Sequence, residues 1–202
     1  MIAQPAPQRM SVDEWRELER TSHDVKHEYI DGRVYAMSGG STKHSRISLN
    51  ACFALESALT EANKECYVYN SDAAARLSSQ RYTYPDTTVT CDEQDRPTGR
   101  TELQFPRVIV EVLSDSTEAY DRGKKFAYYQ ACSSVQEYVL VATKYQSVEV
   151  FRRTSQSHLW TYQAYSPGDT IELTSLGISV PFAAFYRNSG IPETAEEIEG
   201  EV

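Results

Sequence analysis

Apolar residues recur in this chain at both helical and strand spacing, which indicates an architecture of mixed helices and strands. Near the beginning, Ser11 and Glu14 have the spacing of a capping box. Val12, Trp15 and Leu18 then lie on one helical face, so a short helix is predicted from residue 11. The first ten residues contain two prolines and no periodicity, and they are predicted to be a flexible lead (1–10).

A hairpin and a long helix are expected next. Asp31-Gly32 lies between two runs rich in aromatic and β-branched residues, which predicts a tight hairpin whose first strand carries Glu28. Apolar residues then recur near helical spacing over residues 41–62. This pattern predicts a long amphipathic helix with His44 near its start.

Extended segments make up much of the remaining chain. The predicted strands cover residues 67–77 with a polar interruption at 70–72, then 81–91, 108–114 and 137–142, and later 147–153, 158–165 and 170–176. Pro85 suits the entrance or an edge of a strand. A loop is predicted over residues 92–101 and a helix over residues 114–129.

The predicted order is therefore helix, strand, strand, strand, helix, strand, with a hairpin before it and β additions after it. A chain of 202 residues is most economically one domain with one hydrophobic core. We expect an α/β (α+β) fold in a single domain over residues 11–187. The acidic segment 188–202 is expected to be a disordered tail.

One charged residue interrupts the most apolar strand. Five of the seven residues from Val108 to Ser114 are Val, Ile or Leu, as in a strand covered on both faces, and Glu111 lies among them. A buried carboxylate is costly unless a metal, a cation or hydrogen bonds compensate its charge. Asp121, Lys125 and Tyr129 are spaced four apart in the following helix and can face it together.

The net charge of −9 argues against a protein that coats nucleic acid without specificity, since such binding depends on Lys and Arg neutralising phosphates. It does not exclude a metal-dependent nuclease. Five of the acidic residues follow Arg187 with no basic residue among them, so the rest of the chain is only mildly acidic.

The four cysteines, at positions 52, 66, 91 and 132, have no CxxC pair and no matched Cys/His spacing, which excludes a zinc site of the usual kind. No apolar stretch reaches the roughly eighteen residues of a membrane span. The N-terminus lacks the apolar middle of a signal peptide. We therefore expect a cytoplasmic protein with reduced thiols and no membrane association.

Three residues suggest a chemistry. The carboxylates of Asp86 and Glu111 suit a hard cation such as Mg²⁺, and the Lys125 ammonium is suited to holding water or phosphate. A metal held there would bind phosphate and lower the pKa of a water. Alternatively, Glu111 is a core carboxylate satisfied by Lys125 or Tyr129, and spacing alone does not separate these readings.

Several motifs in one order carry a family resemblance: Glu28-Tyr-Ile-Asp31-Gly32, His44, Tyr84-Pro85-Asp86, Glu111-Val-Leu-Ser114, Ser116-Thr117, Asp121-x-x-x-Lys125 and Glu137-Tyr138. From about Ser11 to Tyr186 the chain resembles the Uma family (Uma-two) of the PD-(D/E)XK restriction-endonuclease-like superfamily. The resemblance implies a restriction-endonuclease-like core of helix, three strands, helix and strand. It also implies DNA as the partner and metal-dependent phosphodiester hydrolysis as the activity.

The resemblance assigns roles to individual residues. Asp86 and Glu111 are the expected ligands of Mg²⁺ or Mn²⁺. Leu113 stands where the superfamily pattern places its lysine, and Lys125 on the next helix is the expected replacement, with Lys124 as a weaker one. By analogy with nucleases that dimerise to cut both strands, a homodimer is expected.

Glu28 and His44 have alternative readings. Glu28 is either a third ligand or water-positioning group, or a strand carboxylate paired with His27, Lys26 or Arg33. His44 either binds a substrate phosphate at a helix N-terminus or is a surface or capping histidine.

Two further pairs are expected near these residues. Asp121 is expected to orient Lys125 through an i, i+4 ion pair rather than to bind the metal. Asp72 and Arg76 are expected to form a structural pair.

The leading hypothesis is therefore a metal-dependent DNA endonuclease with Asp86, Glu111 and Lys125 as its catalytic residues. The alternative is a catalytically inactive nuclease-fold protein that acts as a DNA-binding or protein-interaction module, which Leu113 and the acidic balance favour. A third possibility is a phosphodiesterase of small nucleotides. Cutting DNA would require a basic rim, for which the candidates are Lys43, Arg46, Arg76, Arg81, Arg122 and Lys124.

Overall fold

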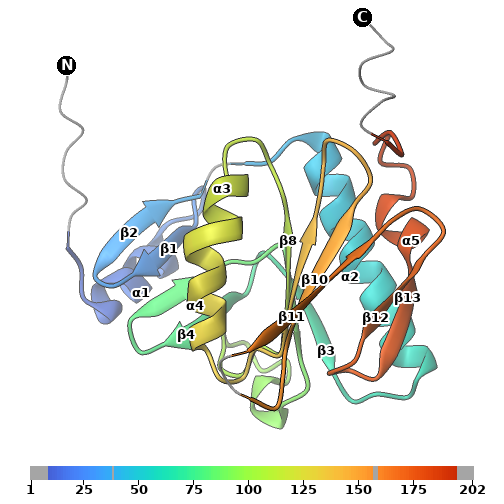
Figure 1. Ribbon diagram of the computed structural model, residues 1–202. Helices are drawn as coiled ribbons and strands as arrows, with labels where there is room; N and C mark the ends of the chain where they lie inside the picture. Colours follow the sequence, from blue (N-terminus) through green and yellow to red (C-terminus); the bar gives the residue numbers. More distant parts are fainter. Residues whose placement is uncertain (1–8, 38, 157–158, 195–202) are drawn as a thin grey trace, which may run out of the picture.

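The computed structural model describes residues 9–37, 39–156 and 159–194. Its core is a six-stranded mixed sheet with strand order β11-β10-β9-β8-β6-β3 (Figure 1). The strands are β3 (Tyr67–Asn70), β6 (Thr87–Thr90), β8 (Val108–Val112), β9 (Glu137–Val141), β10 (Val148–Arg153) and β11 (Trp160–Tyr165). Strands β8 and β9 are parallel, and the other neighbours in this sheet are antiparallel.

Helices cover both faces of this central sheet. Helix α2 (Thr42–Glu61) lies on one face, where it shares one apolar core with Val108, Val110 and Val112 of β8. The segment after β8 contains α3 (Glu118–Tyr120), the π-helical turn η2 (Asp121–Lys125) and α4 (Phe126–Ala131), and it covers the other face. Strand alternation therefore turns Glu111 toward the η2–α4 side.

This arrangement confirms the predicted core. Helix α2, strands β3, β6 and β8, the α3–η2–α4 helix and strand β9 follow one another in the expected order of helix, three strands, helix and strand. The predicted hairpin of β10 and β11 extends the sheet beyond β9.

A second, five-stranded sheet has the order β2-β1-β5-β4-β7. Its strands are β1 (His27–Ile30), β2 (Arg33–Ala36), β4 (Ala74–Ser78), β5 (Arg81–Thr83) and β7 (Glu102–Leu103). Helix α1 (Val12–Thr21) has the predicted capping box and packs Trp15 against the rings of Tyr29 and Tyr82. The predicted β1–β2 hairpin is confirmed, with Asp31 and Gly32 both at positive φ in its turn.

Two segments predicted as single strands are each divided between the two sheets. Residues 67–77 form β3 and β4, separated by a turn in which the Asn70 side chain accepts the Asp72 backbone N–H. Residues 81–91 form β5 and β6, separated at Pro85, which has no N–H for a ladder bond. Asp86 therefore lies where the chain crosses from one sheet to the other.

The C-terminal part adds β12 (Thr170–Leu173), which lies within the strand predicted over residues 170–176. It also adds β13 (Ile178–Pro181) and the short helix α5 (Phe182–Tyr186), which the sequence pattern did not reveal. Beyond residue 187, where the sequence predicts the end of the domain, Ser189 and Ile191 are buried and the Gln146 backbone N–H donates to the Pro192 carbonyl. Residues 195–202 of the predicted tail lie outside the described residues.

At the other end of the chain, part of the predicted lead 1–10 is ordered. Arg9 forms an isolated antiparallel β-bridge with Arg33 through the backbone, and the Met10 N–H donates a hydrogen bond to the Gly32 carbonyl. Residues 9 and 10 are therefore attached to the β1–β2 hairpin. Residues 1–8 lie outside the described residues.

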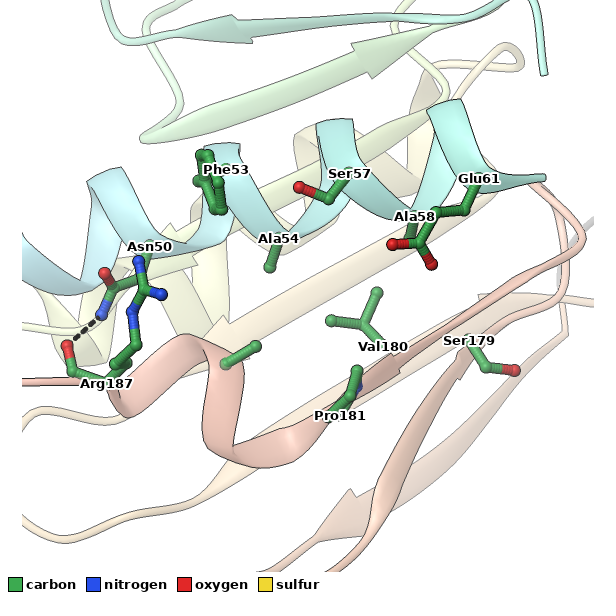
Figure 2. A pocket seen from close by; sticks show the side chains of 11 residues that line it. Asn50, Phe53, Ala54, Ser57, Ala58, Glu61, Ser179, Val180, Pro181 and Arg187 are labelled. Carbon is green, nitrogen blue, oxygen red and sulfur yellow. Dashed lines mark hydrogen bonds between the residues drawn. The ribbon is translucent and has the colours of Figure 1, made fainter. Parts of the chain in front are cut away.

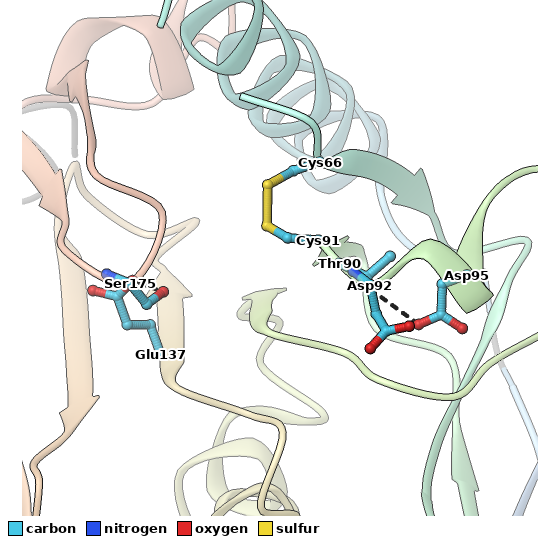
Figure 3. The surroundings of a disulfide bond; sticks show 7 residues. All are labelled: Cys66, Thr90, Cys91, Asp92, Asp95, Glu137 and Ser175. Atoms are coloured by element: carbon cyan, nitrogen blue, oxygen red, sulfur yellow. Dashed lines mark hydrogen bonds between the residues drawn. A yellow bond between two sulfur atoms is a disulfide. The ribbon is translucent and has the colours of Figure 1, made fainter. Parts of the chain in front are cut away.

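A disulfide joins Cys66 to Cys91, 25 residues apart. The two cysteines flank the cross-strand pair Tyr67 and Thr90, so the bond connects the ends of β3 and β6 (Figure 3). The expectation of reduced thiols is therefore wrong for these two residues. Spacing along the chain did not reveal the pair because the β3–β6 register brings it together. Cys52 and Cys132 keep free thiols.

No helix in the described part of the chain is both long and apolar enough to cross a membrane.

The disulfide leads to a prediction about stability. Closing a loop of this length restricts the unfolded chain, so reduction is expected to lower the free energy of unfolding by about 3 kcal/mol. Urea unfolding with and without reductant measures the difference. A Cys66→Ser/Cys91→Ser variant should have the free energy of unfolding of the reduced protein, and reductant should not change it. Cys52→Ser should lose as much stability on reduction as the wild type does. Equal midpoints for the oxidised and reduced wild type would contradict the prediction.

Candidate active site

Glu111 lies in the middle of β8 and is buried, facing the η2–α4 helix. Its Oε1 accepts a hydrogen bond of 2.6 Å from the Tyr129 hydroxyl and lies 2.8 Å from Nζ of Lys125. The helix thus supplies both partners that the strand carboxylate requires. Leu113, two residues along β8, is buried in the apolar cluster on the same face.

Lys125 closes the π-helical turn η2 and is buried. Its ammonium lies among three carboxylates: 2.8 Å from Glu111, 3.3 Å from Glu28 and 3.8 Å from Asp121. The expected ion pair of Asp121 and Lys125 is therefore present. π-helical turns widen a helix by one residue per turn and are frequent at functional sites.

Asp86 lies at the start of β6, directly after Pro85. Strand β6 begins at the next residue, Thr87, which pairs with Val110 of β8, and the negative charge of Asp86 is close enough to Glu111 to act on it. Oδ2 of Asp86 accepts the Val112 N–H at 2.7 Å. The two carboxylates predicted as metal ligands therefore lie at neighbouring points of β8, since Asp86 binds the backbone of the residue that follows Glu111.

His44 faces this pair from the first turn of α2. Ser41 is the N-cap and accepts the His44 backbone N–H, so His44 itself is not the capping side chain. Its Nε2 lies 3.3 Å from Oδ2 of Asp86. The hydrogen bond to Asp86 raises the pKa of His44 above its ordinary value, although burial opposes this effect. His44 therefore belongs to the site rather than to the open surface.

Glu28 reaches the site from the other sheet. Its side chain accepts the Tyr84 N–H at 3.3 Å and pairs with Lys125. His27, one of the partners expected for it, instead binds Glu19 at 2.8 Å. Glu28 thus contacts the ammonium of the cluster.

The expected pair of Asp72 and Arg76 is wrong. Asp72 pairs with Lys26, and Arg76 donates to Oε1 of Gln104 at 2.6 Å. Asp72 pairs with Lys26 because the turn after β3 places it next to the residue before β1. Arg76 lies on β4 and contacts a residue that follows β7 instead.

Lys124, the weaker candidate for the missing lysine, is exposed, while the adjacent Lys125 is buried. Neighbouring helical residues point roughly 100° apart, so both cannot meet Glu111. Two other members of the predicted basic rim, Lys43 and Arg46, are exposed as well.

Two further members of the predicted rim are paired with acids. Arg81 binds Asp31 at 2.8 Å. Arg122 binds Glu118 at 2.9 Å and also contacts Glu149. These pairs reduce the positive potential that the two arginines offer to a phosphate backbone.

Burial dominates the electrostatics of the cluster. It raises the pKa of Glu111 to about 8, with Lys125 acting against the shift and the negative charges of Asp86 and Asp121 adding to it. Burial also raises the pKa of Asp121. For Lys125, burial alone would lower the pKa, but the surrounding carboxylates outweigh it and raise the pKa well above the ordinary value. The lysine therefore remains an ammonium ion at neutral pH.

The donor set has the chemistry of a site for a hard cation. Within the described residues, no group of three or more His, Cys, Asp and Glu side chains is arranged to hold a metal ion by itself. Asp86 and Glu111 nevertheless offer the oxygen ligands that Mg²⁺ prefers, and Mg²⁺ usually keeps several waters. Hydrogen bonds from the described residues use Oδ2 of Asp86 and Oε1 of Glu111, so one oxygen of each carboxylate is available to a ligand.

Gly40 is a member of the site that sequence reasoning missed. A Cβ placed on Gly40 would lie 2.7 Å from Nδ1 of His44, so the imidazole packs directly against the glycine backbone. The two glycines before the Ser41 cap were the available signal, since glycine permits a close approach.

An apolar groove of about 240 Å³ lies elsewhere, between α2 and the β13–α5 segment (Figure 2). Phe53, Val180 and Pro181 are among its lining residues, and the Asn50 amide binds the Arg187 carbonyl at one end. Since α2 faces the opposite side of the central sheet from Glu111, this groove is separate from the acidic cluster.

Comparisons with known proteins agree with this architecture. The model of a family described as "Uma2: Putative restriction endonuclease" matches residues 12–183. The uncharacterized protein slr1290 of Synechocystis sp. (strain ATCC 27184 / PCC 6803 / Kazusa) is 37% identical over 180 residues, which are 89% of this chain and 92% of the relative. A second protein of that organism, sll1609, is 29% identical over 130 residues, which cover 63% of this chain and 72% of the relative.

A solved structure shares the fold. The crystal structure of a "putative nuclease belonging to DUF820" from Anabaena variabilis ATCC 29413 superposes with a TM-score of 0.68 at 17% identity. The match covers 88% of this chain and 97% of that one. The restriction-endonuclease-like fold expected from the sequence is thereby confirmed.

The packing of His44 on Gly40 leads to a prediction. Gly40→Ala should push the imidazole away from Asp86 and lower the pKa of His44 toward its ordinary 6.5, and NMR titration of the imidazole measures the change. Gly39→Ala is the matched control, because a Cβ there meets nothing within 4 Å. If both alanine variants leave the pKa of His44 unchanged, the Gly40 contact does not hold the ring.

The raised pKa of Glu111 leads to a second prediction. A carboxyl group with a pKa of about 8 when folded and about 4.5 when unfolded binds more protons in the folded state between these values. Its contribution to stability is therefore present below pH 4.5 and is lost as the pH rises toward 8. Glu111→Gln should consequently gain stability relative to wild type over that range, measured by urea unfolding in EDTA. A difference between the two proteins that does not change with pH would contradict this assignment.

Proposed function

Because the chain belongs to the Uma2 family of "putative restriction endonucleases", we propose that it is a metal-dependent endonuclease that hydrolyses phosphodiester bonds in DNA. One observation carries the proposal. Asp86 accepts the backbone N–H of Val112, the residue that follows Glu111 on β8, and the helix brings the Lys125 ammonium to 2.8 Å from that same glutamate. Two carboxylates and one ammonium are the groups that this chemistry requires.

Asp86 and Glu111 would hold Mg²⁺ or Mn²⁺ through the carboxylate oxygens that the chain leaves available. When bound, such an ion polarises the phosphate and lowers the pKa of a coordinated water. The Tyr129 hydroxyl and the Val112 N–H keep the two carboxylates in place, since each donates to the oxygen opposite the available one.

Lys125 would hold the attacking water or a phosphate oxygen. Its ammonium stays charged because three carboxylates surround it, and a fixed positive charge near the reacting phosphate stabilises the charge that develops in the transition state. Glu28 and Asp121 act on the reaction through this lysine, by holding its side chain against Glu111.

His44 would bind a phosphate oxygen beside Asp86. Its raised pKa favours the imidazolium form, which can donate a charge-assisted hydrogen bond. The imidazole lies at the first turn of α2, where the helix dipole also favours an anion.

A plasmid assay tests the proposed function. Purified protein with Mg²⁺ or Mn²⁺ should nick or linearise supercoiled DNA, and Asp86→Ala and Glu111→Ala should abolish the cleavage. Lys125→Ala should lower the rate by about a hundredfold, as expected when one charge-stabilising group is removed. Lys124→Ala is the matched control, since it removes the same charge from the adjacent exposed position.

Two supporting measurements make the plasmid result decisive. Removing one partner of a buried charge cluster costs about 3–5 kcal/mol, so thermal unfolding must show that each variant is folded, and Lys125→Arg offers a milder change. Calorimetry should detect metal binding in the wild type and lose it in Asp86→Ala. Intact plasmid with both metals, together with no metal binding by the folded protein, would instead support the inactive nuclease-fold module.

A further inference from the structure

The charge of this protein restricts how it can hold DNA. The chain carries a net charge of −9, and Arg81 and Arg122 are already paired with carboxylates. Binding to duplex DNA depends chiefly on neutralising phosphates with cations. A protein with this net charge, in which two of the candidate rim arginines are already paired, gains from a second source of affinity. Stacking of bases on aromatic rings is such a source, because it contributes affinity in addition to the contacts of cations with phosphates.

Tyr35 offers an aromatic ring close to the acidic cluster. It lies on β2 directly opposite Glu28 on β1, so the two side chains project from the same face of the hairpin. Opposite side chains in an antiparallel pair have Cβ atoms about 5 Å apart. Glu28 pairs with Lys125, yet Tyr35 remains 43% exposed. The ring is therefore partly open to solvent beside Glu28, the carboxylate that pairs with Lys125.

Tyr120 approaches the same place from the helix. It is the last residue of α3, directly before the π-helical turn that positions Lys125. Its half-buried phenol is close enough to Glu28, Lys125 and Tyr35 to interact with them electrostatically. Figure 1 shows the β1–β2 hairpin beside α3. The hairpin and the helix thus present one tyrosine each at the Glu28–Lys125 pair.

A neighbouring tyrosine shows why these two are distinctive. The Tyr128 ring is covered by the guanidinium of Arg81, which lies 4.5 Å from the ring centroid. Its face is already engaged in a cation–π contact and is less available to a ligand.

We propose that Tyr35 and Tyr120 form a stacking site for an unpaired base of the DNA substrate, adjacent to the phosphate held by the catalytic cluster. This inference rests on the proposed function and specifies its substrate class. Bases within a duplex are stacked on one another and expose no face to a protein ring, so the site takes single-stranded DNA or DNA with a locally opened base pair. The enzyme accordingly prefers single-stranded or distorted DNA over intact duplex.

Equilibrium binding tests the stacking site without requiring cleavage. The probe is a fluorescein-labelled single-stranded oligonucleotide, compared with a hairpin duplex of the same length, in EDTA and followed by anisotropy. The wild type should bind the single strand more tightly. Tyr35→Ala should weaken single-strand binding at least about fivefold, the lower end of what one stacked base contributes, and leave duplex binding unchanged. Tyr35→Trp should keep the wild-type affinity.

Tyr162→Ala is the matched control, because Tyr162 is 55% exposed on β11 in the other sheet. It should bind both DNAs as the wild type does. Tyr120→Leu provides a second test of the pair, provided that its thermal unfolding shows a folded protein, and a loss confined to the single strand supports the site. Unchanged single-strand binding by Tyr35→Ala, or an equal loss for both DNAs, overturns the stacking site.

The outcome for stacking is separable from the outcome for cleavage. If the protein cuts plasmid DNA but Tyr35→Ala binds and cuts the single strand as the wild type does, the nuclease stands and the stacking site fails. If the protein cuts no DNA but shows a Tyr35-dependent preference for the single strand, the stacking site stands and the proposed catalysis fails.

Discussion

The buried contact between Glu111 and Lys125 is the constraint on which the candidate site depends. A carboxylate in the middle of a covered strand loses its hydration, and the apolar core around it offers nothing in return. The helix that covers this face therefore supplies an ammonium and a phenol. The ammonium is itself buried, and two further carboxylates, Glu28 and Asp121, lie close to it and compensate its charge. One charge placed in the core thus determines the identity of several side chains on other elements.

This cluster also joins the two sheets. Glu28 comes from the five-stranded sheet, whereas Glu111 belongs to the six-stranded one, and both contact the same lysine. Asp86 lies at the point where the chain passes between these sheets. The site is therefore located at the junction of the two sheets, where side chains from both of them converge.

Much of the fold could be predicted from local patterns. The capping box of α1, the Asp31-Gly32 hairpin and the apolar strand β8 depend on residues close in sequence, and each forms as expected. The split of residues 67–77 and 81–91 between two sheets could not be predicted, because strand periodicity does not reveal which sheet a strand joins. The Cys66–Cys91 pair was missed for a related reason, since it follows from the register of β3 with β6. Residue chemistry suggested Asp86, Glu111 and Lys125 as a set, and the family resemblance assigned their roles. The contacts of His44 with Asp86 and Gly40 depend on the three-dimensional structure and could not be predicted.

The π-helical turn from Asp121 to Lys125 has a consequence for how this protein can be mutated. An α-helix advances by about 100° per residue, so a helix shorter by one residue would carry Lys125 well away from Glu111. Chain length in this turn, rather than the identity of any one side chain, aligns the ammonium with the strand. Substitution scans preserve chain length and would pass over this dependence. Only single-residue deletions or insertions between β8 and α4 can expose it, and relatives that differ in length there would need to place their lysine at a different position.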